Sequence, residues 1–386
     1  MTVAPAPLGV YIHWPYCARI CPYCDFNVVR DRGRSAAGEA LVDAIAADLF
    51  AQAALIAVSS SRSVDLVSIY FGGGTPSLMR PSHVERLIRS VRSLWTARGS
   101  VEVTLEANPA DADPARFQAF AAAGVNRLSL GVQSFDDHAL SFLRRDHDAA
   151  QAGAALAHAL AAFPRVSLDL IYALPGQTPD DWRHSLQAAA SLGASHVSAY
   201  QLTLEPGTPF ARAAQRGTLA AVEDELGAAF YDVTVDTLGR AGFTAYEVSN
   251  FAQGAEARSR HNLVYWRGES YVGVGPGAHG RLVLEGRRTA TEAEPRVQAY
   301  MDRVVNEGAG WRLKDPMASA DVLEERVLMG LRIAEGVEMA DIAELGRTDA
   351  LAPLVAAGWL AAEAGRIRAT RAGRLLLDSV TGALLA

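Results

Sequence analysis

The chain has 386 residues, of which 50% are apolar and 20% charged, the composition of a globular protein with one large domain and an appendage. Its net charge of −7 excludes a globally basic surface for nucleic acid. No apolar run reaches the roughly 20 residues of a transmembrane segment, and residues 1–14 lack the basic and apolar regions of a signal peptide. We therefore expect a cytoplasmic α/β protein; peripheral membrane contact and oligomeric state stay open.

Short apolar runs alternate with amphipathic helical stretches over the first 240 residues. Helices are expected to begin at Asp113 and Thr178, which suit N-cap positions. Strand, helix, strand at this cadence predicts parallel strands joined by right-handed crossovers. We therefore expect a partial (β/α)6 barrel over residues 1–240, with strands at 9–14, 66–71, 101–106, 127–132, 166–174 and 196–202.

Polar residues interrupt or follow each expected strand near its carboxyl end. Glu106, Gln133 and Asp169 lie at the ends of three strands, glycines 72–74 follow another, and the cysteines follow the first. In barrels of parallel strands the carboxyl ends meet at one mouth, where loops converge. We expect the functional site there.

The remaining chain divides into a connecting segment and a small terminal domain. Residues 241–316 carry HNLVYW, expected in a loop, and a predicted hairpin at Glu285 and Gly286. Residues 317–386 show helices, two short strands and a last helix, an order that resembles a winged-helix module. From 312 to 386 there are nine basic and eleven acidic residues, so this α+β module lacks the positive charge that DNA requires.

All three cysteines, Cys17, Cys21 and Cys24, lie within eight residues of one another. An odd, crowded set does not suit a disulfide framework. Cys21-Pro-Tyr-Cys24 alone is compatible with a redox dithiol, and a zinc site is possible with His13 or Asp25 as fourth ligand. The third interpretation, which we favour, is that the thiolates hold three irons of a [4Fe–4S] cluster and leave one iron open.

The spacing C-x3-C-x2-C, with Tyr23 before the third cysteine, resembles the signature of the radical SAM superfamily. This resemblance implies that S-adenosylmethionine (SAM) chelates the open iron and is cleaved reductively. The segment Gly72-Gly73-Gly74-Thr75-Pro76 resembles the superfamily segment that holds the methionyl amino group. Glycines at a strand end let backbone approach a ligand closely.

A wider resemblance, over about residues 10–280, is to the HemN/HemW group of coproporphyrinogen dehydrogenases and heme chaperones. It rests on YIHWPYCARICPYCDFN, YFGGGTPS, VTLEANP, RLSLGVQSF, LDLIYALPGQT and YQLTLEPGT. The resemblance implies that residues around the cluster-bound SAM are Tyr11, Tyr23, Gly73, Gly74, Thr75 and Glu106. It further implies that Gln133, Arg145 and Asp169 match positions for a second SAM. Arg145, between Arg144 and Asp146, also suits a solvated surface.

Two departures favour the heme chaperone branch. The dehydrogenases carry a further cysteine where this chain has Phe26, and a longer segment before the cluster. The chaperone branch associates an HNxxYW motif with heme, which His261 to Trp266 match, and a neutral imidazole is a good axial ligand. We expect a heme chaperone that passes heme to acceptor proteins, with coproporphyrinogen III dehydrogenase as the alternative and another radical SAM reaction as a third option.

The glycine-rich run 273–280 contains a literal GxGxxG that we do not interpret as a dinucleotide site. Pro276 lies inside it and a strand-like run follows instead of a helix. We expect a close backbone approach near the barrel mouth, with His279 as a second heme-side candidate.

Overall fold

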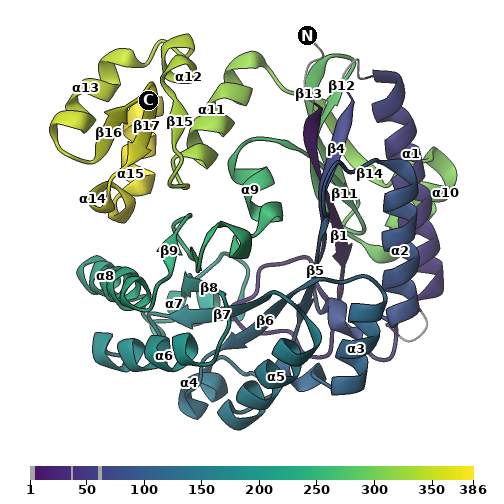
Figure 1. Cartoon of the computed structure of the whole chain (residues 1–386), viewed down its shortest axis with the longest axis horizontal. Coiled ribbons are helices and arrows are strands. Elements are labelled where there is room, and N and C mark those ends of the chain that lie inside the picture. The colour runs from purple at the N-terminus through teal and green to yellow at the C-terminus, as the bar shows by residue number, and fades with distance from the viewer. Residues whose placement is uncertain (1–4, 36–37, 60–62) are drawn as a thin grey trace.

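The computed structural model describes residues 5–35, 38–59 and 63–386, so residues 1–4 of the stretch searched for a signal peptide lie outside it. Its centre is an open, curved wall of parallel strands (Figure 1). In spatial order these are β11 (Ser270–Val274), β1 (Ala6–Trp14), β4 (Val64–Gly73), β5 (Glu102–Ala107), β6 (Arg127–Gln133), β7 (Val166–Tyr172) and β8 (His196–Gln201). The expected partial barrel and its six strands are confirmed.

Antiparallel strands extend this sheet at both edges. Beyond β11 lie β12 (His279–Leu284), β13 (Arg287–Ala293) and β14 (Trp311–Pro316); beyond β8 lie β10 (Asn250–Ala252) and β9 (Thr244–Ala245). The hairpin between β12 and β13 turns at Glu285 and Gly286, both with positive φ, as expected. Residues 241–316 thus add β11 to the barrel wall itself, a pairing with β1 from the other end of the chain.

Helices cover the outer face of the wall and bury its apolar side chains (Figure 1). They are α1 (Glu39–Ser59), α2 (Pro81–Leu94), α3 (Pro114–Ala122), α5 (Ala149–Ala162), α6 (Pro179–Ser191), α8 (Asp224–Arg240) and α10 (Val297–Glu307). Helices α4 (Asp137–Phe142) and α7 (Pro209–Gln215) instead pack in a separate apolar cluster that includes Tyr23. Asp113 caps α3 and Thr178 caps α6 through a capping box, as predicted. Short 3₁₀ turns follow β4 (η1, Pro76–Leu78), β5 (η2, Pro109–Asp111) and β10 (η3, Ala255–Ala257).

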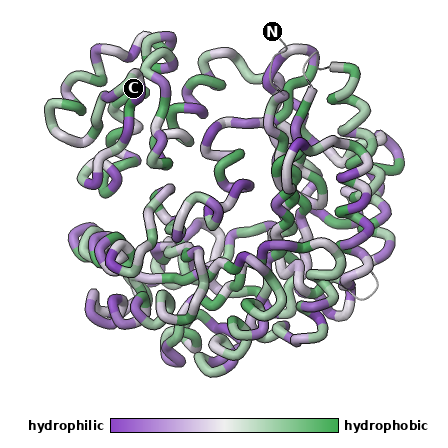
Figure 2. The backbone as a smooth tube through the Cα atoms, in the orientation of Figure 1, coloured by the Kyte–Doolittle hydropathy of each residue, from purple (hydrophilic) through white to green (hydrophobic). Residues whose placement is uncertain are grey.

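Helix α1 corrects the expectation that no apolar segment of the chain is long enough to cross a membrane. Residues Glu39–Val58 are long and apolar enough to cross a bilayer by length and composition. Its charged residues are sparse because the helix packs between the sheet and α2 and α10, with 56% of that window buried. Figure 2 shows apolar segments along α1 and the strands it covers. One such helix, largely buried, is the core helix of a folded domain.

The terminal domain has its own small sheet and core. Its elements are α11 (Ser319–Gly330), β15 (Val337–Glu338), α12 (Met339–Glu344), α13 (Thr348–Ala356), β16 (Leu360–Glu363), β17 (Arg366–Ala369), α14 (Arg371–Leu375) and α15 (Leu377–Leu385). The strand order β15-β17-β16 and a separate apolar cluster match the winged-helix-like arrangement expected from the sequence.

Candidate functional site

The three cysteines lie on a loop that leaves the carboxyl end of β1. Cys17 ends the short strand β2 (Tyr16–Cys17), which pairs with β3 (Val29–Arg30) and closes the loop at its base. Cys21 and Cys24 are joined by a tight turn, with the Cys24 amide 3.3 Å from the Cys21 carbonyl oxygen. All three are free thiols, so the structure holds no Cys21–Cys24 disulfide.

The three thiols do not form a preformed site for a single metal ion. Within the described residues, no three His, Cys, Asp or Glu side chains converge where a single ion would bind. Zinc requires thiolates about 2.3 Å from one centre, whereas thiolates on separate irons of a cube stand farther apart. Burial raises the pKa of Cys17 and of Cys24 to about 11, so a bound metal must displace their protons.

A cavity of about 580 Å³ opens beside the cysteine loop at the carboxyl ends of the strands. Its size lies within the usual range of small-molecule sites. The predicted site residues that line it are Cys17, Cys21, Tyr23, Cys24, Gly73, Gly74, Thr75, Glu106, Gln133, Arg145 and Asp169. The barrel thus brings together residues spread over more than 150 positions of sequence.

Glu106 and Gly73 meet at the wall nearest the cysteines. The Glu106 carboxylate accepts hydrogen bonds from the Gly73 amide at 3.1 Å and from the Tyr70 hydroxyl at 2.7 Å. Gly73 has φ +103°, and a Cβ there would stand 2.4 Å from the His13 ring, so only glycine fits. Burial raises the pKa of Glu106 to about 7, and a cationic amino group beside it would favour its ionised form.

Arg145 lies in the cavity wall and is not a solvated surface residue. Its Nη2 donates to Asn108 Oδ1 at 2.7 Å and to the Gly131 carbonyl at 2.9 Å. Its Nη1 lies 3.5 Å from the Cys21 sulfur. The guanidinium is therefore fixed against the cysteine loop.

Asp169 and Gln133 lie on the neighbouring strands β7 and β6 and line the same cavity. Asp169 accepts hydrogen bonds from Ser129 at 2.8 Å and from Ser167 at 3.3 Å, and burial raises its pKa. Gln133 ends β6 with φ +66°, a left-handed conformation that turns the chain at the cavity rim. Both side chains offer hydrogen-bonding groups suited to ribose hydroxyls.

Tyr11 does not line the cavity. Its hydroxyl bonds His13 Nδ1 at 3.0 Å, and its ring stacks on Tyr70, which does line the cavity. It therefore supports the cavity wall from the layer beneath.

His261 also lies outside the cavity, on a helix instead of the expected loop. The motif forms α9 (Arg260–Trp266), capped by the Ser259 hydroxyl. Two helical turns are too short to show an apolar period in the sequence. The His261 imidazole is 1% exposed, with Nδ1 2.9 Å from Ser68 Oγ and Nε2 2.6 Å from the Tyr265 hydroxyl.

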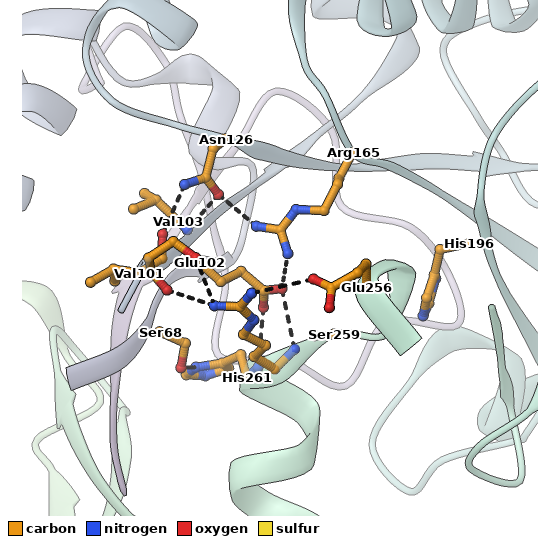
Figure 3. Close-up of polar contacts among 12 residues, drawn as sticks. Ser68, Val101, Glu102, Val103, Asn126, Arg165, His196, Glu256, Ser259 and His261 are labelled. Carbon is orange, nitrogen blue, oxygen red and sulfur yellow. Dashed lines mark hydrogen bonds and ion pairs between the residues drawn. The ribbon is translucent and has the colours of Figure 1, made fainter. Parts of the chain in front are cut away.

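Glu102 anchors α9 against the amino-terminal end of the barrel wall (Figure 3). Its buried carboxylate accepts from the backbone amides of Arg260 at 3.2 Å and His261 at 3.1 Å, and from Arg165 Nη1 at 3.0 Å. Burial lowers the pKa of His261 to about 3, so its imidazole is neutral. In this structure the imidazole is part of the packing of α9, and both nitrogens already have partners.

The glycine-rich run supports the cysteine loop from behind. Asn27 donates to the carbonyls of Pro276 at 2.8 Å and Pro295 at 2.9 Å, and a Cβ at Gly275 would lie 2.3 Å from the His13 carbonyl oxygen. The close backbone approach expected there is present, between antiparallel strands that form no dinucleotide site. His279 is exposed at the start of β12.

Comparison with known proteins decides the family. The radical SAM superfamily profile matches residues 11–189, and the HemN C-terminal domain profile matches residues 317–376. The heme chaperone HemW of Mycobacterium tuberculosis (strain ATCC 25618 / H37Rv) is 38% identical over 387 residues, covering 98% of this chain and 95% of that protein. This chain belongs to the HemN/HemW group of the radical SAM superfamily.

Other members of this group agree. The heme chaperone HemW of Bacillus subtilis (strain 168) is 34% identical, covering 98% of this chain and 99% of that protein. A mitochondrial radical S-adenosyl methionine domain-containing protein 1 of Bos taurus is 42% identical, covering 86% and 76%. The structure of Escherichia coli coproporphyrinogen III oxidase (HemN) matches with a TM-score of 0.80 and 22% identity over 98% of this chain and 90% of that one, which shows a shared fold.

Several cavity residues were missed from the sequence. Arg127 and Ser129 share the inward face of β6 with Gln133, and the alternation of RLSLGVQ was sufficient to find them. Asn108 follows Glu106 by two residues in EANP and lines the same wall. Asn262 reaches the cavity from α9, and no local signal in the sequence indicates that contact.

Proposed function

We propose that this protein is a cytoplasmic heme chaperone of the HemN/HemW group, which binds a [4Fe–4S] cluster, SAM and heme and delivers heme to acceptor proteins. The observation that carries this proposal is that the heme chaperones HemW align with almost the whole chain, while three thiols stand at the mouth of the cavity. Phe26, at the position of the further dehydrogenase cysteine, is 61% exposed beside them.

The cavity residues fit the proposed cofactors by the chemistry of their donors. Cys17, Cys21 and Cys24 would hold three irons, and the cluster, when bound, supplies the electron for reductive chemistry on SAM. Glu106 presents a carboxylate that can accept a hydrogen bond from the amino group of SAM. The neighbouring glycines leave the backbone accessible for contact with the same ligand. Asp169 offers carboxylate oxygens to ribose hydroxyls.

For heme, the structure sets a condition on His261 as axial ligand. The His261 Nε2 is hydrogen-bonded to the Tyr265 hydroxyl, and the ring is buried. Ligation of iron by His261 therefore requires α9 to move away from the barrel wall. His279 is exposed on β12 and needs no such movement. The two histidines therefore predict different behaviour in binding experiments.

Heme binding is tested by hemin titration of the anaerobically reconstituted protein. We expect a stoichiometric Soret shift, and its absence contradicts the proposal. The variants His261→Ala and His279→Ala each lose the shift only if that histidine is the ligand. Tyr265→Phe is the matched variant, because it frees Nε2 while keeping the imidazole: if His261 ligates iron, Tyr265→Phe binds hemin at least as tightly as the native protein.

The alternative function is oxidative decarboxylation of coproporphyrinogen III to protoporphyrinogen IX. It is supported by Gln133, Arg145 and Asp169 lining one cavity, at positions matched to a second SAM in the dehydrogenases. An anaerobic assay of the cluster-loaded protein with SAM and a reductant tests it. Formation of protoporphyrinogen would favour the dehydrogenase, and its absence with a full cluster would eliminate it.

A further inference from the structure

Arg127 is a buried guanidinium that the described residues leave without a direct partner. It begins β6, is 2% exposed and lines the cavity, at the end of the strand opposite the cysteine loop. No residue in the described part of the chain makes a hydrogen bond or ion pair with its side chain. Burial opposes its charge, yet Coulombic attraction, from Glu102 foremost, raises its pKa, so it remains a cation.

The nearest carboxylates are already engaged. Glu102 is shared among Arg165 and the first amides of α9 (Figure 3). Asp169 accepts from Ser129 and Ser167. A buried guanidinium without a direct hydrogen bond to the protein is unfavourable, and native structures satisfy such groups with a partner, water or a ligand.

The surroundings of Arg127 suit one kind of ligand group. Its planar fork of N–H donors matches the two oxygens of a carboxylate. Neutral hydrogen-bonding side chains line the same cavity from other elements, namely Ser198 on β8, Ser249 before β10 and Asn262 on α9. Asn262 belongs to the helix whose first turn is fixed on Glu102, which brings it to the same end of the barrel.

We propose that Arg127, assisted by Asn262, binds a carboxylate of the cavity ligand at the end of the barrel away from the cysteines. The carboxylate we favour is a propionate of heme, an assignment that rests on the proposed function. The carboxylate of a SAM molecule is the other source of the same chemistry. The HNxxYW motif would then contribute Asn262 to the binding site, while His261 holds α9 in place by its buried hydrogen bonds.

The main experiment compares hemin with heme dimethyl ester, whose propionates are uncharged, on the reconstituted protein. We expect the native protein to bind hemin about tenfold more tightly than the ester, as a charge-assisted bidentate contact allows. Arg127→Gln removes this difference, Arg127→Lys restores part of it, and Asn262→Asp weakens hemin more than the ester. Arg144→Gln, an exposed arginine at the rim of the same cavity, keeps the difference.

Two further measurements separate the sources and do not depend on heme. Equilibrium dialysis measures the number of SAM molecules bound per protein. If Arg127→Gln binds one SAM fewer than the native protein but still prefers hemin to the dimethyl ester, the carboxylate bound by Arg127 is that of SAM. Sodium propionate at 100 mM should raise the Tm of the native apoprotein by about 2 °C above equal sodium chloride, and leave Arg127→Gln unaffected.

The proposal is overturned if the ester difference, SAM stoichiometry and propionate effect are all the same in native protein and Arg127→Gln. If the native protein binds no hemin, the proposed function fails, while the SAM and propionate measurements still decide on Arg127. If Arg127→Gln does not fold, the affinities for hemin and for the ester can still be compared in the native protein and in Arg127→Lys. Equal affinities for the two hemes in the native protein, together with no effect of propionate on its Tm, would contradict the proposed site.

Discussion

The guanidinium of Arg145 holds its Nη1 3.5 Å from the sulfur of Cys21, while Nη2 is fixed by Asn108 and the Gly131 carbonyl. These contacts join the loop after β1 to the turn after α4, about 120 residues apart. A positive charge held in place beside the Cys21 sulfur stabilises any added negative charge on that loop.

We therefore expect Arg145→Gln to lower the midpoint potential of the bound cluster by about 50 mV, the effect of removing one cation at this distance in a partly screened site. Arg145→Lys should fall between the two, because it keeps the charge without the fork geometry. A redox titration followed by electron paramagnetic resonance measures the shift. Arg144→Gln is the control, and an equal potential in all three variants would contradict an electrostatic role.

The barrel was predictable because its strands are short apolar runs separated by capped helices. Asp113 and Thr178 mark helix starts through hydrogen bonds to residues three positions later, which are local in sequence. The polar residues Glu106 and Asp169 were predicted to share one mouth because parallel strands place their carboxyl ends together, and both line the cavity.

The position of α9 was not predictable from local patterns. Its position depends on the hydrogen bond from the His261 amide to Glu102, about 160 residues earlier in the chain. It also depends on the absence of a side chain at Gly9, where a Cβ would lie 3.2 Å from Val264 of α9. Sequence periodicity carries no information on such long-range contacts. His261 was interpreted as a heme-side histidine from the resemblance of HNLVYW to the HNxxYW motif, and the sequence did not indicate that both its nitrogens have partners within the fold.

Burial of His261 predicts an acid-sensitive fold. Its folded pKa is about 3 against an ordinary value of 6.5, so its contribution to stability is complete above pH 6.5 and is lost as the pH falls towards 3. Between pH 6.5 and 4.5 the free energy of unfolding should fall by about 2 kcal/mol more in the native protein than in His261→Gln. Urea denaturation at several pH values measures this difference.

The exposed His279 provides the matched control for that series. His279→Gln should follow the native pH dependence, because the His279 side chain is exposed and outside the packing of α9. Parallel curves for the native protein and His261→Gln would show that the imidazole is not held neutral by burial.

Asp48 on α1 predicts a dependence of opposite sign. Burial raises its pKa to about 6 from 3.8, although Gln52, Tyr300 and the Gly310 amide donate to it. Its stabilising contribution is therefore largest below pH 3.8 and is lost as the pH rises through 6. From pH 4 to 7, Asp48→Asn should gain about 2 kcal/mol of stability relative to the native protein. Asp43→Asn, on the exposed face of α1, should show no such gain in the same urea series.

Among the ion pairs that join the terminal domain to the barrel, two differ mainly in burial. Arg332, after α11, pairs with Glu247 at 2.7 Å and lies over the ring of Trp266, the last residue of α9, at 4.8 Å. The Glu247 side chain is 1% exposed. Arg267 pairs with Glu335 at the same 2.7 Å, but both side chains are over a third exposed.

Arg332→Met should cost about 3 to 5 kcal/mol of unfolding free energy, because it leaves the Glu247 carboxylate buried without its cation. Arg267→Met should cost less than about 1 kcal/mol, since water screens the exposed pair. Adding Glu247→Gln to Arg332→Met should recover part of the lost unfolding free energy, because it removes the unpaired buried charge. If the loss came only from poor packing of the methionine, the second substitution would recover nothing. Denaturation followed by Trp fluorescence measures all three, and equal costs for the two single variants would contradict this account of the interface.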